Sequence, residues 1–197
     1  MAPAEDEIPL EHKEIKMRKI IAYLACSADG YIARKDGGID WLMSRKHPRG
    51  NYGLPAFLGS IDTIVWGRST YDQALEMGHG ASFGSTIKNY VFTRRPGKPT
   101  KNVEFVKEPV RKFAKRLRAT PGKNIWMMGG AGIIASFLDA GEIDEFSIHV
   151  IPVLIGDGIP LAAAAHRNVS MKLLSTKRFG DGVVHLNYTV LGTSKHA

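Results

Sequence analysis

The sequence predicts an α/β fold with a mostly parallel central sheet flanked by helices and a C-terminal antiparallel hairpin at one edge. Short apolar runs alternate with segments of helical periodicity along most of the chain, and this alternation is typical of a parallel sheet covered on both faces. The last two segments instead alternate apolar and polar residues on either side of residues 180–182, which read Gly-Asp-Gly, as in an antiparallel hairpin. A length of 197 residues with 44% hydrophobic and 23% charged residues suits one globular domain.

The elements follow one another with clear turn signals between them. The expected strands cover residues 19–26, 31–33, 62–66, 89–93, 103–106, 124–128 and 144–151, followed by the hairpin strands 170–178 and 183–191. The expected helices cover residues 39–46, 54–59, 69–75 and 109–118, with a further helix opened by residues 129–132 that reaches about residue 140. Residues 77–85 are rich in glycine and are expected to form a flexible loop.

The chain divides into a flexible N-terminal tail, residues 1–16, and one domain, residues 17–192. The tail carries several acidic residues and lacks the basic start and apolar core of a secretory signal, and transit peptides avoid acids. We therefore expect a cytoplasmic protein. No run approaches the roughly 18 apolar residues that a membrane-spanning helix needs, so we expect no membrane partner.

A net charge of +8 favours an anionic partner. The densest basic stretch, residues 111–118, has helical spacing that is typical of the solvent-facing side of an amphipathic helix, with Phe113 and Leu117 turned inward. It lacks the interleaved aromatic residues that stack on bases. Nucleic-acid binding through this face remains an alternative, and it would be strongly salt-dependent. The single cysteine, Cys26, and the widely spaced histidines predict no metal site.

Two apolar strands run directly into glycines and then into a helix. After residues 124–128 the chain reads Gly-Gly-Ala-Gly, and after residues 62–66 it reads Gly-Arg-Ser-Thr. Free amides and the positive end of a helix dipole favour a phosphate at such a place, and glycine lets the backbone approach the ligand closely. The spacing differs from the Rossmann fingerprint. The alternatives are a tight strand-to-helix turn and, for Ser69 or Thr70, a helix cap.

A third strand end delivers Thr93, Arg94 and Arg95. Ligands of open α/β sheets lie beyond the carboxyl ends of the strands, so three polar or basic strand ends predict one extended, phosphate-bearing ligand. Two adjacent arginines can hold a monophosphate by forked hydrogen bonds. This pattern favours NADP over NAD.

The order and spacing of these motifs carry a resemblance to a known family. The matching segments are residues 27–33, 37–41, 61–71, 90–94, 125–133 and 150–161, which with the hairpin span almost everything from residue 17 to residue 191. The chain resembles the bacterial and archaeal dihydrofolate-reductase-like proteins related to the C-terminal, pyrimidine reductase domain of the bifunctional riboflavin biosynthesis protein. The resemblance implies an NADPH cofactor and a homodimer.

The resemblance also implies roles for individual residues around the cofactor. The backbone of Ala25 would meet the nicotinamide carboxamide, and Ile32 would pack beside the ring, although both residues also suit a core. Thr93 and Arg94 would recognise the 2′-phosphate, and the adjacent Arg95 would join them through the forked hydrogen bonds described above. The residues that would hold the pyrophosphate and the adenosine phosphate are Gly67, Arg68, Ser69, Thr70, Gly129, Gly130, Ala131, Gly132 and Ile133.

On the substrate side, dihydrofolate reductases place an acid on the helix after the first loop. The best nearby carboxylate here is Asp40, next to Trp41, and we expect Asp40 to donate a proton and Trp41 to contact substrate; alternatively, Asp40 stabilises the start of a helix. Ile134 and His149 stand where those enzymes carry tyrosine and threonine, which weighs against folate. His149 either hydrogen-bonds a substrate ring or is a core histidine with satisfied polar atoms.

The resulting functional prediction is an NADPH-dependent reductase that transfers a hydride to a conjugated C=N or carbonyl group of a small heterocyclic or ribosylamine substrate. One alternative is the reduction of 5-amino-6-(5-phosphoribosylamino)uracil in riboflavin biosynthesis, which would require a separate deaminase. Another, from a different class, is a non-catalytic NADP-binding sensor or scaffold.

Overall fold

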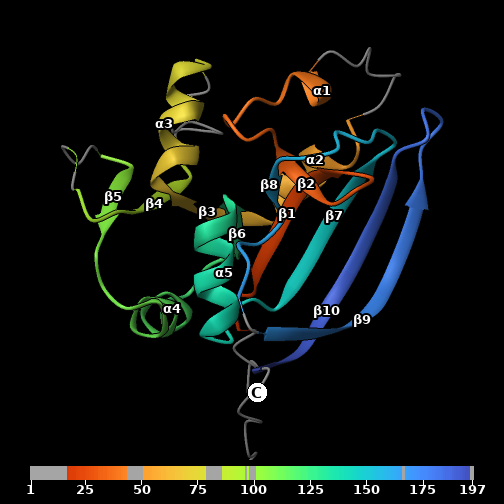
Figure 1. The fold of residues 1–197 in the computed structure, drawn as a ribbon. Helices are drawn as coiled ribbons and strands as arrows, with labels where there is room; N and C mark the ends of the chain where they lie inside the picture. Colours follow the sequence, from red (N-terminus) through yellow and green to blue (C-terminus); the bar gives the residue numbers. More distant parts are fainter. Residues whose placement is uncertain are drawn as a thin grey trace, which may run out of the picture.

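The core of the fold is one eight-stranded sheet (Figure 1). The computed structural model describes residues 17–43, 51–78, 86–95, 97, 101–165 and 167–195. The strand order is β5-β4-β3-β6-β1-β7-β10-β9. Their bounds are β1 Ile20–Ser27, β3 Ile61–Gly67, β4 Lys88–Phe92, β5 Val103–Val106, β6 Asn124–Gly129, β7 Glu145–Ile151, β9 Arg167–Arg178 and β10 Val184–Lys195.

The first six strands in this order pair in parallel, whereas β10 runs antiparallel to both β7 and β9. The predicted sheet with its closing hairpin is therefore confirmed. The hairpin strands are longer than predicted, with 12 residues each. Register shifts between residues 187 and 188 and between residues 190 and 192 interrupt the alternation of apolar and polar residues, which hid this length in the sequence.

Helices cover both faces of the parallel part of the sheet. The helices are α1 Asp40–Met43, α2 Leu54–Gly59, α3 Arg68–Glu76, α4 Val110–Arg118 and α5 Ala131–Asp139. Phe113 of α4 and Phe137 of α5 belong to the core cluster on one face, whereas Phe57 of α2 and Tyr71 of α3 pack into a second cluster with Trp66 of β3. β9 and β10 extend beyond these helices (Figure 1).

Two features differ from the expected elements. β2 Tyr31–Ala33 pairs with β8 Ile159–Pro160 in a separate two-stranded sheet, and β8 was not predicted because two residues show no periodicity. The predicted helix 39–46 begins as α1, but its last residues lie outside the described part of the chain. The predicted tail, residues 1–16, and most of the predicted loop 77–85 also lie outside it.

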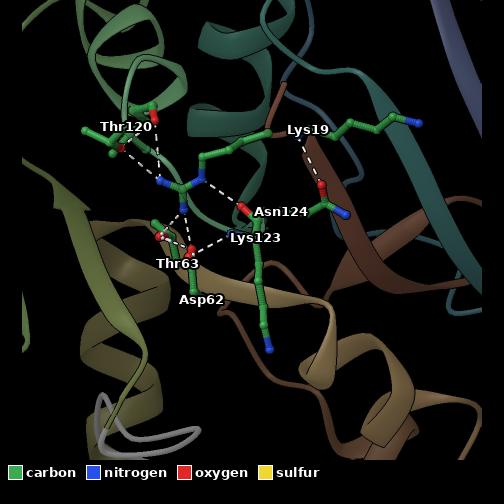
Figure 2. Close-up of polar contacts among 8 residues, drawn as sticks. Lys19, Asp62, Thr63, Thr120, Lys123 and Asn124 are labelled. Carbon is green, nitrogen blue, oxygen red and sulfur yellow. Dashed lines mark hydrogen bonds and ion pairs between the residues drawn. The ribbon is translucent and has the colours of Figure 1, made fainter. Parts of the chain in front are cut away.

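The buried cation Arg18 links residues at the amino ends of the central strands; Figure 2 shows its partners Asp62, Thr63, Thr120 and Lys123. The Arg18 side chain precedes β1 and donates to the Lys123 carbonyl at 2.7 Å and to the Thr63 hydroxyl at 2.7 Å. It also forms an ion pair with Asp62 and donates to the Thr120 hydroxyl at 3.2 Å. These partners lie on or beside β3, β6 and α4. One side chain therefore holds together the amino-terminal ends of the central strands, opposite their carboxyl ends.

Among the described residues, no helix is long and apolar enough to cross a bilayer. In the same part of the chain, no three histidine, cysteine or acidic side chains gather where they could hold a metal ion.

Candidate active site

A cavity of about 1320 Å³ opens at the carboxyl ends of the parallel strands. Its wall combines the ends of β1, β3, β4 and β6 with the first residues of α3 and α5. The predicted residues that line it are Ala25, Ile32, Gly67, Arg68, Ser69, Thr70, Thr93, Arg94, Arg95, Gly130, Ala131, Gly132, Ile133 and His149. The structure thus brings together segments that the sequence separates by more than one hundred residues.

The ends of β3 and β6 approach each other so closely that a side chain at Gly67 or Gly130 would crowd its neighbours. A Cβ atom on Gly67 would lie 3.3 Å from Ile133 Cγ2 and 3.4 Å from the Gly129 carbonyl oxygen, and a Cβ on Gly130 would lie 3.0 Å from Thr70 Oγ1. Gly129 lies just behind the wall, with a φ of 111° that favours glycine and a cis peptide bond to Gly130.

Both glycine turns open directly into helices. Gly67 is the N-cap of α3 and Gly130 is the N-cap of α5, and neither helix has a side-chain cap hydrogen bond. Ser69 and Thr70 lie inside the first turn of α3, so the alternative that they cap this helix is wrong. Because the first amides of a helix have no partner within it, these two starts offer hydrogen-bond donors to a phosphate.

The basic side of the cavity is built around a turn after β4. The Thr93 hydroxyl donates to the Arg95 carbonyl at 3.0 Å and accepts from the Arg95 amide at 3.0 Å. Arg68 donates to the same carbonyl at 3.0 Å and pairs with Asp72 at 2.7 Å. Arg68 therefore orders this turn, and its charge is compensated by Asp72. Within the described residues, no ion pair engages Arg94 or Arg95.

The structure removes Asp40 from the candidate site. Its carboxylate forms two hydrogen bonds with Arg34, at 2.6 and 2.8 Å, on the surface rather than in the cavity wall. The hydrogen bond and the charge of Arg34 lower the pKa of Asp40. An exposed carboxyl group that ionises this readily is a poor proton donor, so the predicted catalytic role is not supported by the geometry. Its place at the first residue of α1 suits the alternative of a helix-stabilising acid.

Trp41 is also misplaced for a substrate contact. Its side chain is buried against Ile151 and Val183 and does not line the cavity. Its indole Nε1 has no hydrogen-bond partner in the part of the chain that the structure describes. The sequence pattern around the short helix α1 indicated the position of Trp41 but not the direction in which its ring points.

His149 does line the cavity, and burial keeps it neutral. Its Nε2 lies 3.1 Å from the Tyr52 carbonyl oxygen; because a carbonyl only accepts, this nitrogen donates. The ring stacks on His185 with centroids 4.1 Å apart. Burial and the nearby His185 lower the pKa of His149 to about 4. His149 therefore lines the cavity and already has a backbone partner.

Sequence reasoning missed an aromatic group next to His149 and one cation of the cavity wall. Tyr23, Trp126 and Lys107 line the cavity, and Phe57 stacks on Tyr23. Tyr23 looked like a core residue of the first strand. Nothing in the linear sequence indicates that it meets two aromatic residues from other elements.

Two of the five basic residues of α4 pair with acidic side chains. Arg116 pairs with Glu104 and Glu108, and Arg118 pairs with Glu142 and Asp144. Phe113 and Leu117 are buried, as predicted for an amphipathic helix. Acidic partners compensate these two arginines, which leaves less free positive charge on this face for a phosphate backbone.

The fold and the cavity define a dihydrofolate-reductase-like α/β protein. Residues 81–185 match the RibD C-terminal domain, and the chain therefore belongs to that family. It is 39% identical to the uncharacterized protein YwjB of Bacillus subtilis (strain 168) over 167 residues, which cover 84% of this chain and 95% of that protein.

Solved structures confirm the fold class. The "Putative riboflavin biosynthesis protein" of Shewanella sp. PV-4 superposes with a TM-score of 0.77 at 27% identity, over 87% of this chain and 98% of that one. The Thermotoga maritima diaminohydroxyphosphoribosylaminopyrimidine deaminase/5-amino-6-(5-phosphoribosylamino)uracil reductase gives 0.66 at 14% identity, over 89% of this chain and 57% of that one. Enterococcus faecalis dihydrofolate reductase, complexed with NADP(H), superposes with a TM-score of 0.58 at 16% identity, over 88% of this chain and 96% of that one.

Proposed function

We propose that this protein is an NADPH-dependent reductase that transfers a hydride to a small heterocyclic or ribosylamine substrate. The observation that carries the proposal is one cavity in which two uncapped helix starts and the Arg94–Arg95 turn converge. Membership of the RibD C-terminal domain family supports an oxidoreductase.

The cavity fits this cofactor in size and in chemistry. Its volume of about 1320 Å³ exceeds the roughly 300–1,000 Å³ that is typical for one drug-sized ligand, which leaves room for a dinucleotide and a second ring. The amides at the starts of α3 and α5 would hold the pyrophosphate, and Arg94 and Arg95 the 2′-phosphate. Ala25 and Ile32 would flank the nicotinamide, which supplies the hydride; the chain binds, orients and shields the reactants from water.

A more specific candidate is reduction of 5-amino-6-(5-phosphoribosylamino)uracil. The family favours it, and the Thermotoga maritima relative carries that activity in its name. The absorbance of the nicotinamide measures NADPH consumption. Assays with this compound and with dihydropterins distinguish uracil reduction from dihydropterin reduction. NADPH binding without consumption of any of these compounds would instead favour a sensor or scaffold.

We expect the protein to bind NADPH on the order of 10–100 times more tightly than NADH, because charge-assisted hydrogen bonds contribute about 1.5–3 kcal/mol each. Replacing Arg94 and Arg95 together by alanine should abolish this preference and leave NADH binding within a few-fold of the original. Isothermal titration calorimetry measures both affinities. Lys112→Ala, on the outer face of α4, is the matched control for loss of positive charge. Equal binding of the two cofactors before and after the change would show that these arginines do not hold the 2′-phosphate.

We also propose a homodimer that forms through β9 and β10. Met171, Leu173 and Leu174 of the edge strand β9 are 40%, 47% and 53% exposed, although they are apolar, and an exposed edge strand of this kind promotes pairing. Analytical ultracentrifugation should give twice the chain mass of 21.6 kDa, and Leu173→Lys should shift the protein toward the monomer. A monomeric wild-type protein at micromolar concentration would contradict this proposal.

A further inference from the structure

The substrate end of the cavity holds a tyrosine whose ring is fixed by its neighbours. Tyr23 of β1 stacks on Phe57 of α2, with centroids 4.0 Å apart and an interplanar angle of 14°. Trp126 of β6 meets it edge-on at 5.8 Å, and His149 of β7 lies 5.0 Å away. Four elements therefore determine the direction in which the Tyr23 ring points, and the residue forms part of the cavity wall.

The hydroxyl of Tyr23, a residue of the cavity wall, has no hydrogen-bond partner within the described part of the chain. Among the described residues, no hydrogen bond involves this hydroxyl, although the Tyr23 carbonyl accepts from Trp126 Nε1 at 2.8 Å. By contrast, the hydroxyl of Tyr52, in the same wall, donates to Asp181. Burial alone raises the pKa of Tyr23 to about 12, with no contribution from a charged neighbour. The phenol thus keeps its proton throughout the neutral range.

The other candidates for a proton donor are weaker at this end. In the described residues, the cavity wall contains no aspartate or glutamate. His149 Nε2 already donates to the Tyr52 carbonyl, and its pKa of about 4 leaves the ring without a second proton at neutral pH. His185 stacks on His149, and its ring centroid lies 6.3 Å from that of Tyr23. Its Nε2 forms a hydrogen bond of 2.7 Å with the Ser147 hydroxyl. At this end of the cavity, Tyr23 is therefore the proton donor whose hydroxyl has no hydrogen-bond partner among the described residues.

Resting on the proposed reductase function, we propose that Tyr23 is the catalytic proton donor. When a hydride adds to the carbon of a C=N or C=O bond, the π electrons of that bond move to the nitrogen or oxygen. This atom takes the Tyr23 hydroxyl proton, so that one N–H or O–H bond forms as the phenol O–H bond breaks. Water then returns a proton to the phenolate. A nascent alkoxide or amide anion is more basic than a phenolate, so the proton transfer is downhill even though the phenol is a weak acid.

Tyr23→Phe tests this assignment because it keeps the ring packing and removes the hydroxyl alone. With 5-amino-6-(5-phosphoribosylamino)uracil or a dihydropterin as substrate, we expect kcat to fall on the order of 10²–10⁴-fold, with KM and NADPH affinity changed only a few-fold. The wild-type kcat should be flat from about pH 6 to about pH 9, since neither the His149 ring nor the phenol titrates there. The residual activity of the variant should fall about tenfold per pH unit, because hydronium replaces the missing donor.

A binding measurement provides a readout without turnover. Lumazine, a pteridine with carbonyl and ring-nitrogen acceptors, should bind the NADP⁺-loaded wild type about tenfold more tightly than Tyr23→Phe, as expected for one lost hydrogen bond. Tyr188→Phe is the matched control, because Tyr188 packs against the α4–α5 side of the sheet and lies outside the cavity wall. Its kcat and lumazine affinity should match those of the wild type.

The outcomes distinguish this inference from the proposed function. A wild-type protein that does not bind NADPH in calorimetry overturns the reductase proposal itself. If NADPH binds, equal turnover by wild type and Tyr23→Phe, or equal lumazine binding by both, including none by either, overturns the role of Tyr23 alone.

Discussion

Replacement of Arg18 by methionine is expected to lower the free energy of unfolding by about 3 kcal/mol, the lower end of the range for breaking a buried ion pair. The Arg18 side chain is only 6% exposed, and its removal leaves Asp62 without its cation and the Lys123 carbonyl without a donor (Figure 2). The lower end applies because the Asp62 side chain is 36% exposed, so water can partly solvate it. Asp62 also retains the Lys123 amide, which donates to it at 2.8 Å.

Urea denaturation followed by circular dichroism measures this loss. Lys19→Met is the matched control: Lys19 is the next residue and pairs with Glu145, but its side chain is 47% exposed, so a change below about 1 kcal/mol is expected. The double variant Arg18→Met/Asp62→Leu should recover part of the loss, because removing both charges leaves no unpaired ion. If Arg18→Met lowers the free energy of unfolding no more than Lys19→Met does, the Arg18 network does not hold the amino-terminal ends of the strands together.

The contrast between Arg18 and the glycine turns shows what the sequence could predict. Residues 62–70 and 124–132 each form a strand, a glycine turn and a helix start in one continuous stretch, so local chemistry reveals them. The parallel sheet then brings their ends together without further information. Arg18 instead finds partners 44 to 105 residues away, and no local pattern indicates them.

The same reasoning explains why the sequence is a weaker guide to the residues around His149 and α1. Asp40 follows the first loop in the sequence, but its ion pair with Arg34 depends on how that loop folds back. A tyrosine in an apolar strand, such as Tyr23, normally indicates a core residue. Its environment consists of Phe57, Trp126 and His149, which come from three other elements. The lining of a substrate pocket depends on side chains from distant parts of the chain, which local sequence does not predict. A phosphate site depends on backbone turns, which it does predict.

Substitution of Gly130 by valine is expected to weaken NADPH binding by at least about 100-fold, which corresponds to about 3 kcal/mol. The backbone of Gly130 has φ −86° and ψ −157°, which other residues can adopt, so the cause is steric rather than conformational. A Cβ atom would already lie 3.0 Å from Thr70 Oγ1, and the two additional methyl groups have to enter the space between the starts of α3 and α5. They would occupy the place where the amides are to meet the pyrophosphate.

Calorimetry with NADPH measures the loss, and a thermal melt shows whether the variant is folded. Gly192→Ala is the matched control, because a Cβ at Gly192 meets no atom within 4 Å and the residue lies outside the cavity wall; its NADPH affinity should match that of the wild type. The NADPH affinity of Gly130→Ala should lie between those of Gly130→Val and Gly192→Ala, since the Thr70 side chain has to shift by only a few tenths of an ångström. A folded Gly130→Val protein that binds NADPH within a few-fold of the wild type would place the pyrophosphate elsewhere, because no phosphate could then approach the amides at this turn.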